Sequence, residues 1–208
     1  MAIGTYTELQ SAVANWLDRD DLTARIPEFI SLAEARMNRV LRLRLMENKY
    51  TASTVASQRN YALPTGYLQM RNFQINTSPV TPVQYVSPEI YDRLYGSTST
   101  GTPQFYTILA GEVQLGPIPG SVMTMEMLFY KKISALSAAN PTEAMLTDNP
   151  DIYLYGALME AEPFVMNDER VPLWMQGFQQ AVNDLQEQDN KDRHSGSALR
   201  VMNTGGYY

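Results

Sequence analysis

Apolar positions in the first 45 residues recur with the period of a helix. Thr5 and Glu8 match a capping box, in which each side chain satisfies a free amide of the first turn. The apolar stripe that follows consists of Leu9, Val13, Trp16 and Leu17. A second helix is expected to begin near Asp21 or Pro27 and to end at about Leu43. Its apolar face consists of Phe29, Ile30, Ala33, Met37, Val40 and Leu41.

From residue 47 the pattern changes to short alternating segments between turn residues, which is typical of strands. The predicted strands are 50–55, 61–63, 68–75, 104–109, 113–115 and 122–130. The first two are expected to pair with each other, and Gly111 predicts a hairpin between 104–109 and 113–115. In 122–130 the period of two places Met123, Met125, Met127 and Phe129 on one face. One short helix is expected at 88–95.

Helical spacing returns after Pro150. One helix is expected to begin there, with Asp148 or Asn149 as its cap, and to kink or end at Pro163. A last helix is predicted from about Pro172 to Lys191. Its apolar seam consists of Trp174, Phe178, Ala181 and Leu185.

The element order predicts an α+β fold. Helices from both ends of the chain form one bundle, and a mainly antiparallel β lobe is inserted between them. The expected segments are 1–46 and 139–194 for the bundle, 47–138 for the β lobe and 195–208 for a C-terminal extension. Because neither helical segment can bury its seam alone, we expect Trp16 and Trp174 both to be largely buried.

Charge is distributed unevenly along the chain. The formal net charge is −6, and residues 139–192 carry eleven acidic side chains against Arg170 and Lys191. A protein that binds DNA phosphates tightly would show a basic stripe instead. The basic side chains near the end of the second helix are Arg36, Arg39, Arg42 and Arg44. Their simplest role is a solvated face that complements the helix dipole, and the alternative is a charged channel or interface.

Residues that carry chemistry are scarce. The chain has no cysteine and one histidine, His194, which excludes thiolate metal sites and disulfides and disfavours a catalytic triad. The loop at 96–101 lacks the lysine of a phosphate-binding loop. Glu160 and Glu162 are two residues apart on a helix and point in different directions. We therefore predict no catalytic residue, no metal site and no cofactor. Neither a secretory signal nor a membrane span is visible.

Several short motifs follow one another along the chain. The first is FISLAEARMNR at 29–39, in the predicted second helix. The others are YALP at 61–64 with Tyr67 and Leu68, GTP at 101–103 with Phe105 and Tyr106, LGPIP at 115–119, LFY at 128–130, and NPD at 149–151 with YGAL at 155–158. In their order and spacing these motifs resemble the head-to-tail connector adaptors of tailed bacteriophages, which include the tail tubular protein A type, and 29–39 resembles the second helix of these proteins. The resemblance covers roughly residues 6–190.

This resemblance implies a structural protein of the virion, assembled in the bacterial cytoplasm. Such adaptors form a ring, usually a dodecamer, beneath the portal protein. Double-stranded DNA passes through the ring without sequence-specific binding, and the next tail or nozzle protein docks on it. The family's C-terminal extension typically reaches onto the portal. Its candidate anchors here are Leu199, Arg200, Val201, Met202, Tyr207 and Tyr208.

Two other functions fit the residues. One is a ligand-binding or enzymatic domain, in which the tyrosines of the β lobe line a pocket. The other is a nucleic-acid regulator that uses the arginines of the second helix. Rings seen by native mass or negative stain support the adaptor, a saturable small ligand supports the pocket, and salt-dependent duplex binding supports the regulator.

Overall fold

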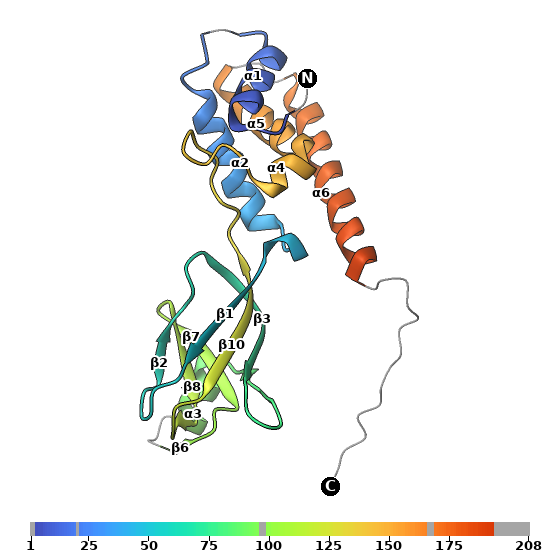
Figure 1. The fold of residues 1–208 in the computed structure, drawn as a ribbon. Helices are drawn as coiled ribbons and strands as arrows, with labels where there is room; N and C mark the ends of the chain where they lie inside the picture. Colours follow the sequence, from blue (N-terminus) through green and yellow to red (C-terminus); the bar gives the residue numbers. More distant parts are fainter. Residues whose placement is uncertain (1–2, 20, 96–98, 166–168, 194–208) are drawn as a thin grey trace. The chain divides into compact units, whose positions relative to one another are not determined.

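The computed structural model divides the chain into two compact units (Figure 1). It describes residues 3–19, 21–95, 99–165 and 169–193. Met1–Leu43 and Ile133–Tyr208 together form what we call the helical unit, and Arg44–Lys132 form the β unit. Both ends of the chain thus contribute to one unit, and the other is inserted between them. The α+β class predicted from the sequence is confirmed.

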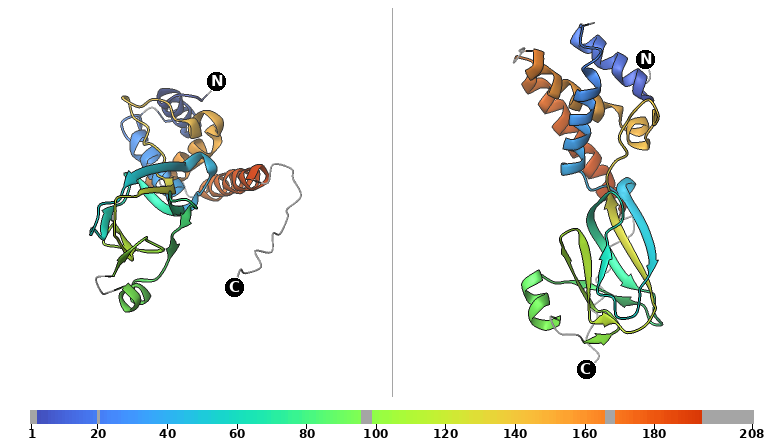
Figure 2. Two further views of the ribbon diagram at one scale, coloured as in Figure 1. Left: turned by 60° about the horizontal axis from the view of Figure 1, so that its bottom comes forward. Right: turned by 90° about the vertical axis from the view of Figure 1, so that its left-hand side faces the viewer.

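The helical unit is built around α5. Its helices are α1 (Tyr6–Leu17), α2 (Ile26–Val40), α4 (Ala144–Asp148), α5 (Pro150–Val165) and α6 (Val171–Arg193). α5 contacts all four of the others, and Figure 2 shows the helices gathered around it. Residues 152–154 and 156–159 of α5 are buried without a polar stripe between them. A helix that is apolar all round is the expected centre of such a bundle.

Gly156 allows α2 and α6 to approach α5 closely. A Cβ atom at this position would lie 3.0 Å from Cβ of Ala33 on α2 and 3.3 Å from the ring of Phe178 on α6. Both contacts are tighter than ordinary van der Waals distance, so a larger side chain would push the helices apart. The close packing around α5 therefore depends on a residue without a side chain.

The start of α1 confirms the predicted capping box. The Glu8 amide donates to Thr5 Oγ1 at 3.3 Å, and the Thr5 amide donates to Glu8 Oε2 at 3.0 Å. The expectation that Trp16 is buried is wrong, because 44% of its surface is exposed. Leu9, Val13 and Leu17 form the buried seam of α1 at intervals of four residues. Trp16 lies at the margin of that seam and covers Trp174 from outside, with ring centroids 5.4 Å apart.

The C-terminal helices differ from the sequence prediction in three details. The short helix α4 was not predicted, and α5 continues through Pro163 to Val165. Pro163 lies two residues before the end of α5, so the hydrogen bond that it removes belongs to the last turn and not to the buried middle of the helix. In α6 the buried seam consists of Trp174, Phe178 and Val182. The predicted seam contained Ala181, but the buried residue is Val182. It lies four positions after Phe178, as Phe178 lies four positions after Trp174.

The β unit holds two four-stranded sheets. The first has the order β1 (Glu47–Ser53), β10 (Thr124–Lys131), β3 (Tyr67–Ile75), β4 (Thr81–Pro82). The second has the order β2 (Asn60–Ala62), β8 (Glu112–Gly116), β7 (Phe105–Leu109), β5 (Gln84–Tyr85). The remaining elements are the 3-10 turn η1 (Arg44–Met46), α3 (Pro88–Tyr95), β6 (Thr100–Gly101) and β9 (Ile118–Pro119).

The core of the β unit lies between these sheets. The first sheet contributes Phe73, Ile75, Met125 and Met127, and the second contributes Tyr61, Tyr106, Val113 and Leu115. The predicted face of 122–130 is confirmed, since Met125, Met127 and Phe129 are all buried. α3 is attached to the second sheet, because the buried Tyr91 hydroxyl donates to the Leu115 carbonyl at 2.7 Å.

One predicted strand pairing is confirmed and another is wrong. β7 and β8 form the hairpin predicted at Gly111, where Ala110 and Gly111 both adopt positive φ, as a two-residue turn requires. The segments 50–55 and 61–63 do not pair, because β1 pairs with β10 and β2 pairs with β8. Between them the chain crosses from one sheet to the other, and Thr54 Oγ1 secures the crossing by bonding Met123 N and Ser121 O.

Candidate interaction surfaces

The four arginines proposed as channel or interface charges have different surroundings. Arg36 forms an ion pair with Glu160 of α5, with a shortest N–O distance of 2.5 Å. Arg42 Nη1 donates to the carbonyls of Asn38 and Leu41 and so caps the end of α2. Arg44 lies on η1 in the β unit. Arg39 projects from the last turn of α2 and is exposed.

The C-terminal end of α2 is also held by α6. Gln186 Nε2 donates to the Val40 carbonyl at 3.4 Å, and Arg193 Nη2 donates to the Arg42 carbonyl at the same distance. Arg193 is itself oriented by Asp189 at 2.8 Å. Helix ends leave carbonyl groups without partners, and cationic or amide donors satisfy them here. The basic cluster predicted around α2 therefore serves partly to close this helix end.

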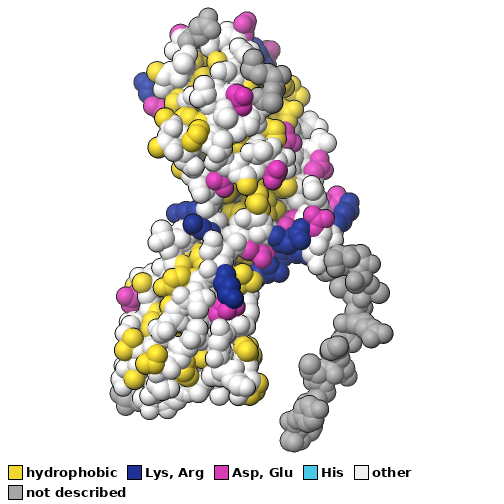
Figure 3. Space-filling model, in the orientation of Figure 1, with side chains coloured by type: hydrophobic (Ala, Val, Ile, Leu, Met, Phe, Trp, Pro, Cys, Tyr) yellow, Lys and Arg dark blue, Asp and Glu magenta, His cyan; other side chains and the backbone are white. Residues whose placement is uncertain are grey.

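The acidic side chains of residues 139–192 are divided between the surface and the interior. Glu160 turns to Arg36, whereas Glu162 is buried and accepts a hydrogen bond from Trp174 Nε1 at 2.9 Å. The prediction that this pair points in different directions is confirmed. On the face drawn in Figure 3, acidic side chains are scattered over the helical unit rather than gathered into one patch.

Two polar side chains of α2 hold the segment that follows β10. Glu34 Oε1 accepts from the Leu136 amide at 2.8 Å, and Asn38 Oδ1 accepts from the Ile133 amide at 2.9 Å. These residues are four apart and lie on one face of the helix. Sequence analysis did not identify them. The available signal was the pair of polar residues, at i and i+4, beside the apolar stripe of Ala33 and Met37.

Burial raises the pKa of Glu34 from 4.5 to about 6, and the nearby carboxylate of Glu143 adds to this. The folded protein therefore holds a proton on Glu34 at pH values where the unfolded chain has lost it. Stability should fall as the pH rises from 4.5 to 6, by up to about 2 kcal/mol.

Glu34→Gln should remove this slope of stability against pH, because the glutamine side-chain oxygen still accepts from the Leu136 amide but the side chain does not titrate. Urea unfolding between pH 4.5 and 7, followed by tryptophan fluorescence, measures it. Glu187→Gln is the control, since Glu187 is 66% exposed and pairs with Lys191. A slope that persists in Glu34→Gln and disappears in Glu187→Gln contradicts the assignment.

An aromatic groove lies at the surface of the helical unit. It has a volume of about 370 Å³ and is lined by Trp16, Tyr155, Leu173, Trp174, Gln176, Gly177 and Gln180. Tyr155 and Trp174 stack with ring centroids 6.2 Å apart, and Trp16 meets Tyr155 edge-on at 6.1 Å. No charged side chain lines the groove. Its exposed apolar surface is suited to a protein contact rather than to phosphate.

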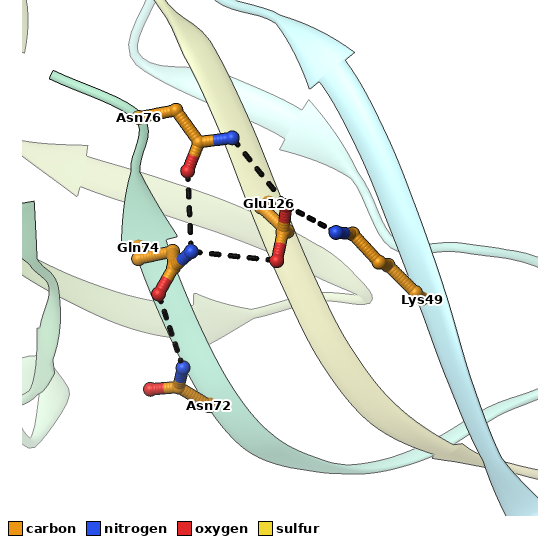
Figure 4. A network of polar contacts seen from close by, with 5 residues as sticks. All are labelled: Lys49, Asn72, Gln74, Asn76 and Glu126. Carbon is orange, nitrogen blue, oxygen red and sulfur yellow. Dashed lines mark hydrogen bonds and ion pairs between the residues drawn. The ribbon is translucent and has the colours of Figure 1, made fainter. Parts of the chain in front are cut away.

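The outer face of the first sheet carries a polar network (Figure 4). The Glu126 carboxylate, on the central strand β10, forms an ion pair with Lys49 of β1 at 2.6 Å. It also accepts a hydrogen bond from Gln74 Nε2 of β3 at 3.3 Å. Asn76 and Asn72 extend the network along β3. The Lys49 ammonium holds the pKa of Glu126 below its usual value. The sequence signal for this face was the alternation of Asn72, Gln74 and Asn76 in the strand pattern.

Tyrosines of the β unit differ in burial, and Tyr50 and Tyr85 are exposed. Tyr61, Tyr91 and Tyr106 are buried, and the Tyr61 hydroxyl accepts from the Val55 amide and lies within hydrogen-bond distance of the Val55 and Gln58 carbonyls of the sheet crossing. Within the described ranges, no group of three or more His, Asp or Glu side chains could hold a metal ion. In the same ranges no helix is both long and apolar enough to cross a membrane.

The proposed anchors from Leu199 to Tyr208, and His194, lie outside the described residues.

Comparison with known proteins bears on the whole of this architecture. A family model described as SU10 adaptor protein matches residues 4–202. The comparison with curated proteins finds no match. The family match spans the helices of both chain ends and the inserted β unit, and it confirms the resemblance to phage adaptors. The chain therefore belongs to the SU10 adaptor protein family, a family of phage head–tail adaptors.

Proposed function

We propose that this phage adaptor forms a ring beneath the portal protein, continues the DNA channel and presents a docking platform to the tail. The observation that carries the proposal is the family match across residues 4–202. The ring is expected to be dodecameric, as the resemblance to connector adaptors implies. It is assembled in the host cytoplasm and then occupies the head–tail junction of the virion.

The charge distribution supports passage of DNA without tight binding. The chain carries a net charge of −6, and two of the four arginines near the end of α2 have structural partners in α5 or in the helix end itself. A ring that must let DNA slide benefits from few phosphate contacts, because each one strengthens binding at low salt. Arg39 is the exposed residue of this group on α2, and we assign it the role of a channel or interface charge.

We further propose that residues 195–208 attach the ring to the portal. This segment contains three glycines, which raise the entropic cost of ordering it in isolation. Its apolar and aromatic anchors are Leu199, Val201, Met202, Tyr207 and Tyr208, and Arg200 can pair with an acidic surface. α6 ends at Arg193, two residues before this segment begins.

Truncation after His194, mixed with purified portal, tests this attachment. We expect normal folding and ring formation with loss of portal binding, measured by co-sedimentation and native mass. The full chain carrying Thr204→Ala is the matched control, because it leaves every proposed anchor in place. Unchanged portal binding by the truncated chain rules the attachment out. Loss of folding would also contradict it, because the segment would then belong to the subunit core.

A further inference from the structure

The helical unit carries two exposed apolar surfaces. The first is the aromatic groove, where the rings of Trp16, Tyr155 and Trp174 meet and no charged side chain lies in the lining. The second lies where α2 meets α5. It consists of Leu32 and Phe164, which are 50% and 53% exposed, and we call it the α2–α5 patch. Exposed apolar surface of this kind is typical of protein contacts.

Contacts between α2 and α5 bring Leu32 and Phe164 together. Phe164 packs on Phe29 of α2, with ring centroids 5.7 Å apart. Leu32 follows Phe29 by three residues and is therefore its neighbour on the helix surface. The Arg36–Glu160 ion pair lies on the same side, because Arg36 follows Leu32 by one turn and Glu160 precedes Phe164 by one turn. The patch is thus one continuous surface across two helices.

The groove and the α2–α5 patch open on opposite sides of the unit. Tyr155 and Phe164 are nine residues apart on α5. Nine residues make about two and a half helical turns, so the two side chains leave α5 in opposite directions. Tyr155 stacks on Trp174 of α6. Phe164 packs on Phe29 of α2. One subunit therefore cannot join its own patch to its own groove, and a two-fold pair of subunits cannot join both at once.

Gly156 marks a common level of three helices. A Cβ atom there would lie close to both Ala33 of α2 and Phe178 of α6. From this level α2 and α6 run in the same direction, because their C-terminal ends meet where Gln186 donates to the Val40 carbonyl. Positions that are equally far along α2 and α6 from Gly156 therefore lie at similar heights in the unit.

Both apolar surfaces lie at this level or within about two turns of it, toward the N-terminal ends of α2 and α6. In the patch, Leu32 directly precedes Ala33. In the groove, Tyr155 directly precedes Gly156, and Trp174 comes one turn before Phe178. The two surfaces are therefore matched in height as well as in apolar character.

Opposite charges lie beside the two surfaces, again at one height. Arg39 on α2 and Asp184 on α6 each come six residues, or about 9 Å, after the residue of their helix that contacts Gly156. Arg39 follows Leu32 by two turns, and Asp184 follows Gly177 of the groove by two turns, so each charge shares a side of its helix with the apolar surface. Both are exposed, and neither has an ion-pair partner among the described residues.

We propose that the groove of each subunit receives the α2–α5 patch of a second copy of this chain, with Arg39 of that copy facing Asp184. This inference rests on the proposed ring. A rotation about an axis parallel to α5 brings patch and groove together without a change of height, so the apolar contact and the ion pair form together. Because the surfaces differ and lie on opposite sides, the contact is heterologous and repeats until the ring closes. A foreign partner would use the groove alone, whereas a second copy accounts for the patch and for both charges.

Two introduced thiols test the contact, because the chain contains no cysteine. The double variant Arg39→Cys/Asp184→Cys is assembled into rings, with portal where assembly requires it, and treated with a short bifunctional maleimide. The lost ion pair is exposed and should weaken assembly little. We expect a ladder of cross-linked species up to the size of the ring on a denaturing gel. An equal mixture of the two single variants should stop at dimers, and each single variant alone should remain monomeric.

Gln179→Cys in place of Asp184→Cys is the matched control. Gln179 is exposed on the same helix, but it lies about 140° around α6 from Asp184 and away from the groove. Combined with Arg39→Cys, it should give no ladder.

Each outcome separates this inference from the proposed function. If the unmodified chain forms no ring, alone or with portal, the proposed function fails and this inference fails with it. If rings form and the double variant gives no ladder, or the control gives the same ladder, only this inference is overturned. Dimers from a single variant alone reveal a two-fold contact, and cross-links to portal or tail protein assign the surface to another partner. Both results overturn it.

Leu32→Glu tests the apolar part of the contact. It places a carboxylate against an uncharged aromatic groove, so the subunit concentration needed for ring assembly should rise by at least about tenfold. Ser31→Glu is the matched control, because Ser31 is exposed beside Leu32 on another side of α2. A Leu32→Glu chain that folds and assembles as the unmodified chain does contradicts the proposal. If it does not fold, the cross-linking result alone decides.

A charge exchange tests the polar part. Arg39→Glu sets two carboxylates face to face and should weaken assembly, most strongly at low salt. Arg39→Glu/Asp184→Arg restores the pair with its signs exchanged, and it should recover assembly. Equal loss of assembly in the single and the double variant would show that Arg39 and Asp184 do not face each other.

Discussion

Replacing Trp174 by alanine is expected to lower the free energy of unfolding of the helical unit by about 3–5 kcal/mol. Trp174 is 7% exposed, and its ring contacts Trp16 at 5.4 Å and Tyr155 at 6.2 Å. Its Nε1 donates to Glu162, a carboxylate that is 1% exposed. The alanine variant loses the packing of a large ring and leaves Glu162 buried without this donor. Both effects destabilise the same site.

Two further variants separate these contributions. Trp174→Phe keeps an aromatic ring but removes the donor, and it should cost about 1–3 kcal/mol. Met175→Ala is the control on the same helix, because Met175 is 50% exposed and should change stability by less than about 0.5 kcal/mol. Urea unfolding followed by far-ultraviolet circular dichroism measures all three. A stable fold of residues 1–46 alone, or an unchanged midpoint for Trp174→Ala, would contradict joint packing of the two chain ends.

Phe73→Ala is expected to destabilise the β unit by a similar amount, about 3–5 kcal/mol. Phe73 is 1% exposed in the core between the two sheets. Its ring meets Tyr106 of the second sheet edge-on, with centroids 5.2 Å apart, and its strand partner is Met127. Removing the ring leaves a cavity where the sheets meet. Because the β unit is compact in itself, we expect the amides of residues 44–132 to lose more protection than those of the helical unit.

Hydrogen exchange analysed by mass spectrometry gives the required resolution along the chain. Asn72→Ala is the matched control, because Asn72 is next to Phe73 in the sequence and lies on the exposed face of the same strand. That variant should leave the core intact and change stability only slightly. Equal loss of protection in both units on Phe73→Ala would show that they unfold as one body, and it would falsify the expectation of separate cores.

Local patterns in the sequence predicted most of the elements. The capping box at Thr5 and Glu8, the alternating methionines of β10 and the turn at Gly111 each depend on residues close together in the chain. Such signals follow from backbone hydrogen bonding and side-chain periodicity, which are local properties. The order of helices and strands then predicted the α+β class, and the ordered motifs predicted the adaptor family, which the family match confirms.

Only the tertiary structure decided which strand pairs with which and which side chains meet. β1 and β2 are consecutive but belong to different sheets, because both pair with strands that come about fifty to eighty residues later. Trp16 carries the same apolar signal as Leu17 but remains exposed, since α1 packs on α5 and α2 and Trp16 lies at the margin of its buried face. Glu34 and Asn38 appear polar in the sequence and become buried or half-buried acceptors once the returning segment lies against α2. A one-dimensional pattern records how apolar a residue is, but burial and pairing depend on which distant segments the fold brings beside it.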